Sequence, residues 1–205
     1  MESTLFTIGH SNLDIDSVKS ALREYGIDAV VDVRSQPYSK FSPQFNKNDL
    51  AASLKDSNIA YAFMGRELGG RPDNRAYYDA EGYVRYDLWS QDEAFQEGIR
   101  RLLKGAAERR IALLCSEEDP AHCHRHLLIA RVLNEGGFPG ANILHIRALA
   151  TEWGCIQDDE IPRQRSLFGE ELAWRSPQSV LHKVLRSTSS SDSDALEFAD
   201  SSTFG

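Results

Sequence analysis

The chain has 205 residues, of which 41% are hydrophobic, and its formal net charge at pH 7 is −8. This apolar content is enough to bury a core, and no apolar run in the chain is long enough to cross a bilayer. The acidic balance argues against a protein that coats nucleic acid through unselective phosphate contacts, because such proteins cluster Lys and Arg.

The N-terminal residues predict a protein that stays in the cytoplasm without a membrane partner. They lack the basic segment and the long apolar stretch of a secretory signal. The three cysteines are an odd number and do not make a disulfide framework. In a reducing compartment we expect them to be thiols, metal ligands or small buried hydrophobic residues. The oligomeric state is left open.

Short apolar segments alternate with segments of helical period along the chain. Strands are expected at residues 5–8, 29–33, 59–64, 111–114 and 142–146. Helices are expected from the turn after the first strand to Gly26, at about residues 49–57 with Asn48 as cap, and at about 92–107 and 124–134. This alternation is typical of a parallel sheet with right-handed crossovers. We therefore expect a three-layer α/β domain, Rossmann-like or flavodoxin-like, over residues 1–150.

Three other segments lack such a pattern. Residues 65–89 mix glycine, arginine and tyrosine without a period and predict a long ordered loop, which in a compact domain is more often functional than idle. Residues 151–186 are expected to form a C-terminal extension. Residues 187–205 are acidic, rich in serine and without Lys or Arg, so we expect a disordered tail.

Polar residues follow four of the predicted strands at the points where these strands end. In open α/β sheets, ligands bind beyond the carboxyl ends of the strands, so these groups are expected to meet at one rim of the sheet. The densest group lies in residues 113–126, which hold two thiols, three carboxylates, three imidazoles and an arginine. The candidate site residues are His10, Ser11, Asn12, Asp32, Arg34, Tyr38, Gly69, Gly70, Arg71, Cys115, Glu117 and Arg125.

The same motifs resemble a widespread bacterial and archaeal family known as domain of unknown function 488. The resemblance rests on residues 7–12, 31–37, 43–46, 67–71, 114–117 and 123–125. It implies an α/β domain and a cytoplasmic, enzyme-like pocket. It implies no reaction, because the activity of the family is unknown.

One chemistry that fits these residues uses the carboxylates. Glu117 and Asp32, together with His10, would transfer protons to or from a nucleotide or another anionic ligand derived from nucleic acid. The anionic group would be held by Arg34, Arg71 and Arg125, and a base would stack on Tyr38 or Phe41. We favour this hypothesis of a hydrolase or transferase, with a link to DNA repair or replication.

A second chemistry makes Cys115 a nucleophile, as in sulfurtransferases or phosphatases. Its thiolate would be stabilised by helix amides and by Arg34 or Arg125. His10 or His124 would move the proton. The three carboxylates that follow Cys115 oppose this hypothesis, because they raise the pKa of a neighbouring thiol and repel anions.

A third alternative is a zinc site made by Cys115, Cys123 and His124, with His10 as the fourth ligand. We do not favour a metal, because the spacing is unusual and the neighbours Cys123 and His124 are not expected to face one ion easily. No cofactor is therefore predicted. In a purely structural alternative, Cys123 packs under the helix, His124 caps it, and Arg125 pairs with Glu117 or Asp119.

A late segment suggests a different role, in binding rather than catalysis. Residues 164–168 resemble the pentapeptide by which bacterial replication and repair proteins hold the DNA sliding clamp. Gln164 would lead the peptide, and Leu167 with Phe168 would enter an apolar groove. Arg165 departs from the usual apolar residue. A non-catalytic module that reaches DNA through the clamp is therefore the competing functional class.

Overall fold

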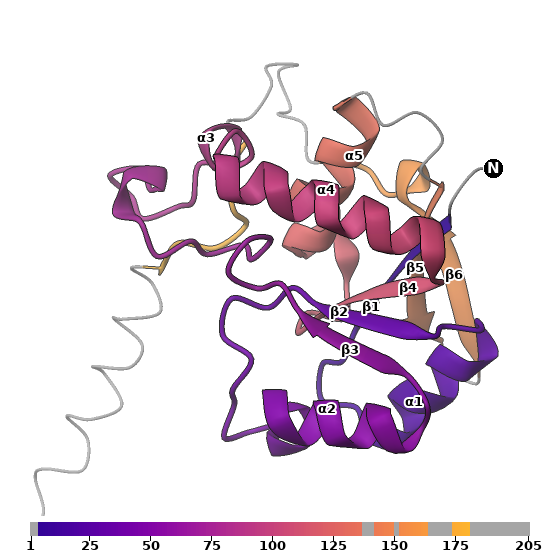
Figure 1. The fold of residues 1–205 in the computed structure, drawn as a ribbon. Coiled ribbons are helices and arrows are strands. Elements are labelled where there is room, and N and C mark those ends of the chain that lie inside the picture. Colours follow the sequence, from indigo (N-terminus) through magenta and orange to yellow (C-terminus); the bar gives the residue numbers. More distant parts are fainter. Residues whose placement is uncertain (1–3, 137–141, 150–151, 164–173, 181–205) are drawn as a thin grey trace, which may run out of the picture.

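A computed structural model of the chain describes residues 4–136, 142–149, 152–163 and 174–180 (Figure 1). Within these residues a single six-stranded sheet has the order β3-β2-β4-β1-β5-β6. The strands are β1 (Thr4–Gly9), β2 (Ala29–Asp32), β3 (Ala60–Phe63), β4 (Ile111–Cys115), β5 (Asn142–Ala148) and β6 (Trp153–Gln157). The first five are parallel, and β6 runs antiparallel to β5. The predicted α/β class is confirmed.

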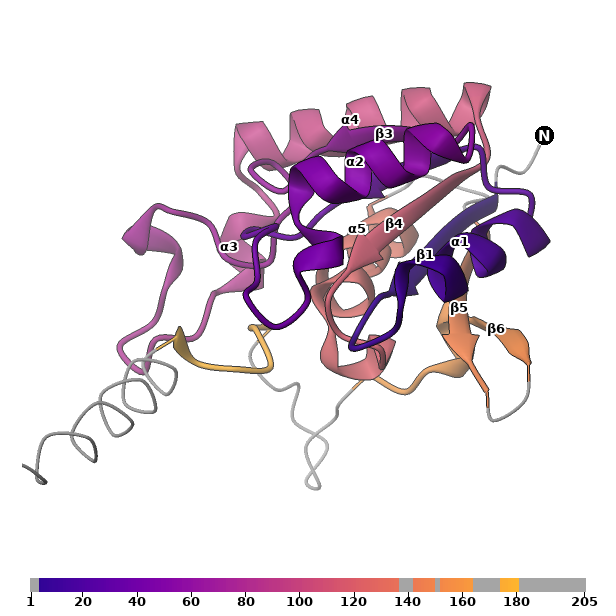
Figure 2. The ribbon, with the colours of Figure 1, turned by 90° about the horizontal axis from the view of Figure 1, so that it is seen from below.

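Helices cover both faces of the sheet (Figures 1 and 2). One face carries α1 (Ile15–Glu24) and α2 (Lys47–Asp56), and the other carries α4 (Glu93–Glu108) and α5 (Arg131–Glu135). A short helix α3 (Tyr86–Trp89) lies in the long loop before α4. The 3-10 turns are η1 (Pro43–Phe45), η2 (Arg75–Tyr77), η3 (Pro120–His122) and η5 (Asp158–Glu160), and η4 (Arg125–Ala130) is a π-helical segment that leads into α5.

The ends of the helices follow from local chemistry. Asp14 caps α1 by accepting a hydrogen bond of 2.7 Å from the backbone N–H of Ser17. The chain leaves α1 at Gly26, which has a φ of 63°, a left-handed conformation that glycine adopts without strain. The prediction that Asn48 caps the second helix is wrong, since α2 begins at Lys47 and its N-cap is Asn46.

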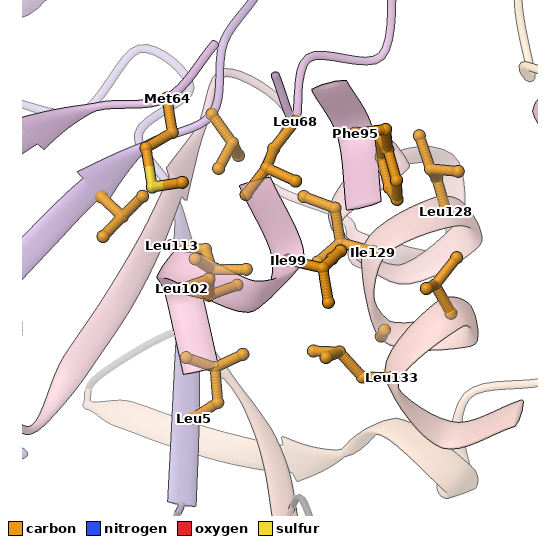
Figure 3. Packing of buried hydrophobic residues seen from close by; sticks show 14 of the residues in the cluster. Leu5, Met64, Leu68, Phe95, Ile99, Leu102, Leu113, Leu128, Ile129 and Leu133 are labelled. Atoms are coloured by element: carbon orange, nitrogen blue, oxygen red, sulfur yellow. The ribbon is translucent and has the colours of Figure 1, made fainter. Parts of the chain in front are cut away.

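Two apolar clusters hold the three layers together, one on each face of the sheet. Successive residues of a strand point to opposite faces, so Leu5 of β1 joins the cluster under α4 and Phe6 joins the cluster under α1 and α2. Leu5, Leu102, Leu113 and Ile129 pack in the first cluster (Figure 3). This burial on both faces explains why β2 and β4 are almost continuously apolar.

The sheet continues past residue 150, where we expected the domain to end. β6 belongs to the predicted extension, yet it pairs with β5 from Ala148↔Trp153 to Leu144↔Gln157. The described residues 174–180 also return to the domain, where the backbone N–H of Tyr86 bonds the carbonyl of Trp174 at 2.9 Å. The predicted tail, residues 187–205, lies outside the described residues. None of the described helices has both the length and the apolar character needed to span a membrane.

Candidate functional site

A cavity of about 350 Å³ opens at the carboxyl ends of β1, β2 and β4. Nine residues singled out in the sequence line it: His10, Ser11, Arg34, Tyr38, Gly70, Arg71, Cys115, Glu117 and His124. Six others complete the lining: Ser35, Gln36, Ser39, Ser42, Ser116 and Gln178. The predicted residues Asn12, Asp32, Gly69, Cys123 and Arg125 are not part of this lining.

The strand register explains why distant segments meet here. β1 and β4 pair so that Gly9 lies beside Cys115, and β2 pairs with β4 so that Asp32 lies beside Leu114. The three strands therefore end at the same level, and the residues that follow them share one rim. The backbone N–H of His10 continues this ladder by bonding the carbonyl of Cys115 at 3.0 Å.

Arg34 is held rigidly by a buried ion pair with Asp32. Its Nε donates to Asp32 Oδ1 at 2.8 Å and its Nη2 donates to Oδ2 at 2.7 Å. Tyr61 also donates to Oδ2, at 2.8 Å, and Asp32 has no exposed surface. Asp32 therefore lies beneath the pocket with its oxygens occupied, and it fixes the direction of the guanidinium.

His10 is a neutral ring wedged between Arg34 and Phe45. Its Nδ1 donates to the carbonyl of Ser11 at 2.8 Å, so its Nε2 accepts from Arg34 Nη1 at 3.1 Å. The ring stacks on Phe45 with centroids 4.2 Å apart. Burial, and then the positive charge of Arg34, lower the pKa of His10 to about 4. At neutral pH His10 therefore orients Arg34 and carries no charge.

Two thiols, an imidazole and a carboxylate converge on the floor of the pocket. His124 Nε2 donates to the carbonyl of Val33 at 3.0 Å, which turns Nδ1 toward the thiols. Nδ1 lies 3.6 Å from Cys115 Sγ and 3.8 Å from Cys123 Sγ. Glu117 Oε2 lies 2.9 Å from Cys115 Sγ and 3.5 Å from Cys123 Sγ. Although Glu117 is exposed as a residue, its carboxylate faces these thiols.

The charges of this cluster influence one another. Burial raises the pKa of Glu117, but hydrogen bonds from Cys115 and the backbone outweigh it and lower the pKa below its usual value. For His124, burial lowers the pKa, and the opposing effects of Cys123 and Glu117 raise it overall. Burial raises the pKa of Cys123 well above that of an ordinary thiol. The cluster therefore favours an ionised carboxylate beside a protonated Cys123 when no ion is bound.

Arg125 supports the loop after β4 from below. It has no exposed surface, and its guanidinium donates to the carbonyl oxygens of Glu117 and Glu118. It therefore binds backbone, not the carboxylate of Glu117, and it does not face the pocket as a ligand for an anion. Gly9 makes this contact possible, because a Cβ at this position would lie 1.7 Å from the Glu117 oxygen.

The two predicted loop glycines serve close packing. A Cβ at Gly70 would lie 2.8 Å from the Cβ of His124, so this glycine lets the imidazole lie against the loop. A Cβ at Gly69 would lie 2.2 Å from the carbonyl oxygen of Gly65. The carbonyl of Gly69 accepts a hydrogen bond of 3.0 Å from Trp89 Nε1. The long loop is therefore packed against both α3 and the pocket floor.

The sequence reasoning missed a buried network around Asp158, on η5 after β6. His126 Nδ1 lies 2.6 Å and His145 Nε2 lies 2.9 Å from Asp158 Oδ1, and Asn134 donates to Oδ2 at 2.8 Å. Thr7 bonds His145 Nδ1 at 2.7 Å. Burial raises the pKa of Asp158, but the two histidines lower it far below its usual value overall. A lone Asp in a polar stretch gives no signal of this contact across the fold.

Gln178 is another lining residue that the sequence did not indicate, since it comes from the described segment 174–180, far from the strand ends in the chain. The clamp candidates Gln164, Leu167 and Phe168 lie outside the described residues. That hypothesis therefore stays a prediction.

Comparison with known families covers the motifs at this rim that follow β2 and β4. The family model described as "Domain of unknown function DUF488" matches residues 14–132, more than half of the chain. The protein belongs to the DUF488 family. The match ends within α5, so it includes β4 and the thiol cluster. No curated protein and no solved structure matches the chain.

Proposed function

We propose that this DUF488 protein is an enzyme, a hydrolase or a transferase, that acts on a small anionic ligand of nucleotide type in the strand-end pocket. The observation that carries the proposal is that one cavity of about 350 Å³ is lined both by cationic side chains and by the Cys115–Glu117–His124 cluster. This volume lies at the lower end of the range for small-molecule sites. It suits a ligand about as large as a nucleoside monophosphate.

Arg34 and Arg71 would hold the anionic group. Contacts within the protein use four of the five N–H groups of Arg34, which leaves one on Nη1 for a ligand. Since this guanidinium is already fixed, a ligand loses little further side-chain entropy by binding it. Arg71 is half-buried, and no hydrogen bond or ion pair engages its guanidinium within the described ranges. Arg71 can therefore turn its charge toward a ligand.

The mouth of the pocket offers groups for the rest of the ligand. Tyr38 lines the cavity with 61% of its surface exposed, and Phe41 nearby in the chain is 85% exposed. Exposed aromatic rings stack on bases with little dependence on their sequence. Hydroxyls of Ser39 and Ser42 also line the cavity. These groups support a ligand with a flat ring and polar substituents.

Glu117 would be the proton-transfer residue. Its carboxylate lies at the cavity wall and is ionised at neutral pH, as a general base must be. Asp32 and His10 would position Arg34 instead, because Asp32 is saturated with hydrogen bonds and the lone pair of His10 is occupied. The thiol of Cys115 donates a hydrogen bond of 2.9 Å to the carboxylate of Glu117 and so lies beside the proposed proton-transfer group.

A binding experiment tests the proposal. Calorimetry would compare nucleoside monophosphates, inorganic phosphate and uncharged nucleosides on the full chain. We expect the monophosphates to bind, and Arg71→Met to weaken them roughly tenfold or more, the equivalent of one charge-assisted hydrogen bond. Arg100→Met is the matched control, because Arg100 pairs with Glu97 on α4 and does not line the pocket.

Turnover tests the catalytic part of the proposal. Glu117→Gln should abolish turnover of any nucleotide that the parent protein converts while leaving its binding in place. Monophosphates that bind no better than nucleosides, or Arg71→Met with unchanged affinity, would contradict the proposed ligand class. Turnover unchanged by Glu117→Gln would contradict the role of this residue.

A further inference from the structure

The donor atoms on the pocket floor have the spacing of a metal site. Cys115 Sγ, Cys123 Sγ and His124 Nδ1 all lie within 4.8 Å of one another. The imidazole nitrogen is 3.6 Å from one sulfur and 3.8 Å from the other. Two ligands of a tetrahedral zinc ion, at bond lengths of about 2.3 Å for sulfur and about 2.05 Å for nitrogen, lie about 3.6 Å apart. The observed separations match this value.

Without a metal, each thiol has a hydrogen-bond acceptor, Glu117 Oε2 for Cys115 and His124 Nδ1 or Glu117 Oε2 for Cys123, yet both sulfurs gather around the same imidazole nitrogen. Because His124 Nε2 donates to the carbonyl of Val33, Nδ1 has a single lone pair, and two thiols face it. The same thiols also converge on a single carboxylate oxygen of Glu117. One metal ion bound by two thiolates and the imidazole would satisfy all three donors at once.

We propose that Cys115, Cys123 and His124 bind a divalent metal ion, with zinc as the ion that suits two thiolates and an imidazole. The backbone corrects the expectation that the neighbours Cys123 and His124 do not face one ion. Cys123 is extended, with φ −124° and ψ 142°, whereas His124 is already helical, with φ −61° and ψ −20°. This break, just before the π-helical segment, turns both side chains to the same side.

The other buried cluster that could hold a metal fails the same geometric criterion. In the group of His126, His145 and Asp158, the two nitrogens lie 2.6 and 2.9 Å from one carboxylate oxygen. Nitrogen and oxygen ligands of one zinc ion lie about 3.4 Å apart at standard bond lengths. The observed separations are those of hydrogen bonds. This group is therefore a hydrogen-bond network.

The fourth coordination position faces the pocket. Cys115 and His124 line the cavity, whereas Cys123 lies behind them with 1% of its surface exposed. Glu117 Oε2 is 2.9 Å from Cys115 Sγ, closer than the roughly 3.6 Å expected between sulfur and oxygen ligands of one zinc ion. Glu117 is therefore not a ligand in this arrangement. Its carboxylate borders the cavity beside Cys115 and His124, and it would be free to accept a proton from a ligand there once metal binding removes the Cys115 S–H that it accepts in this structure.

Three protein ligands and one open position are typical of catalytic zinc, which lowers the pKa of its bound water. In zinc deaminases of nucleobases, His and Cys ligands hold the zinc, and a glutamate that is not a ligand acts as general acid and base. The proposed metal site depends on the proposed function only for the identity of the substrate that a metal-bound water would attack. The site itself depends on the three donors alone.

Metal analysis and cobalt substitution test the site. The full chain, purified in reducing buffer without chelator, should carry an equimolar amount of zinc by elemental analysis. The metal-free protein should take up Co²⁺ and develop the thiolate charge-transfer and visible absorption bands of tetrahedral cobalt. Cys115→Ser and Cys123→Ser should lose this uptake.

Two controls keep the outcome specific. Cys155→Ser alters the exposed thiol of β6, and Glu117→Gln removes the carboxylate that is not a ligand, so both should keep stoichiometric cobalt. A folded parent protein that binds neither ion would overturn the inference, as would equal loss of cobalt in Cys155→Ser. The cobalt spectrum of the parent protein still tests the metal site if a variant of one of the ligands does not fold. Nucleotide binding without metal would refute only the metal site, and metal binding without nucleotide binding would refute only the proposed ligand.

Discussion

Replacing Gly9 by alanine tests the close approach of β1 to the loop that carries Glu117. The new Cβ would lie 1.7 Å from the Glu117 carbonyl oxygen and 2.6 Å from Arg125 Nη1. Real Cβ contacts below 3.0 Å are essentially never seen, so the carbonyl must retreat by at least 1.3 Å. That movement breaks the buried hydrogen bond between Arg125 and this carbonyl.

The expected cost follows from that broken contact. A buried charged donor left without its partner costs about 3 kcal/mol. Alanine also reduces the freedom of the unfolded chain, which stabilises by only about 0.4–1 kcal/mol, so the strain dominates. A net loss of about 2–3 kcal/mol lowers the melting temperature of a chain of this size by roughly 4–12 °C.

Urea denaturation followed by tryptophan fluorescence measures this effect. Gly105→Ala is the matched control. Gly105 lies within α4, and a Cβ at this position would approach one side-chain atom, Ile111 Cδ1, at 3.2 Å. We expect the control to be neutral or stabilised by up to about 1 kcal/mol through helix propensity. If Gly9→Ala unfolds at the same urea concentration as the control, the proposed packing of Arg125 beneath the loop is wrong.

Three further predictions concern other parts of the molecule. The folded-state pKa of Asp158 is depressed below its usual 3.8, so the stability that this carboxylate contributes is complete above that pH and is lost as the pH falls below it. Asp158→Asn should therefore reduce the pH dependence of the free energy of unfolding, measured by urea titrations between about pH 5 and 2. An unchanged pH dependence in this variant would refute the prediction. Arg34→Lys keeps the charge but loses the paired bonds to Asp32, so we expect a loss of about 2–4 kcal/mol by the same assay, and a loss below about 0.5 kcal/mol would show that the paired geometry does not matter. Replacing Leu167 and Phe168 by alanine should abolish capture of the full chain by an immobilised DNA sliding clamp, a prediction that fails if the parent chain is not captured.

The apolar pattern was sufficient to predict five strands and the order of strands and helices. β2 and β4 are buried on both faces, so their sequences are nearly continuous in apolar residues, and this signal is local. β6 gave no such signal, because none of its residues is fully buried at the edge of the sheet. Its place depends on pairing with β5, a contact that the sequence does not display.

The residues of the candidate site were likewise predictable in part. The sequence placed His10, Arg34, Cys115 and Glu117 at strand ends, and parallel strands that end together bring such residues to one rim. The sequence could not assign Arg125, whose direction depends on carbonyl oxygens supplied by a folded loop.

The residue types and their positions along the strands were therefore determined by the sequence itself. The tertiary structure decided which side chains support the loop and which face the cavity. It also decided that two thiols and one imidazole nitrogen lie within 4.8 Å of one another. The physical reason is that hydrophobic periodicity acts over a few neighbouring residues, whereas the direction of a polar side chain is set by the partner it finds across the fold.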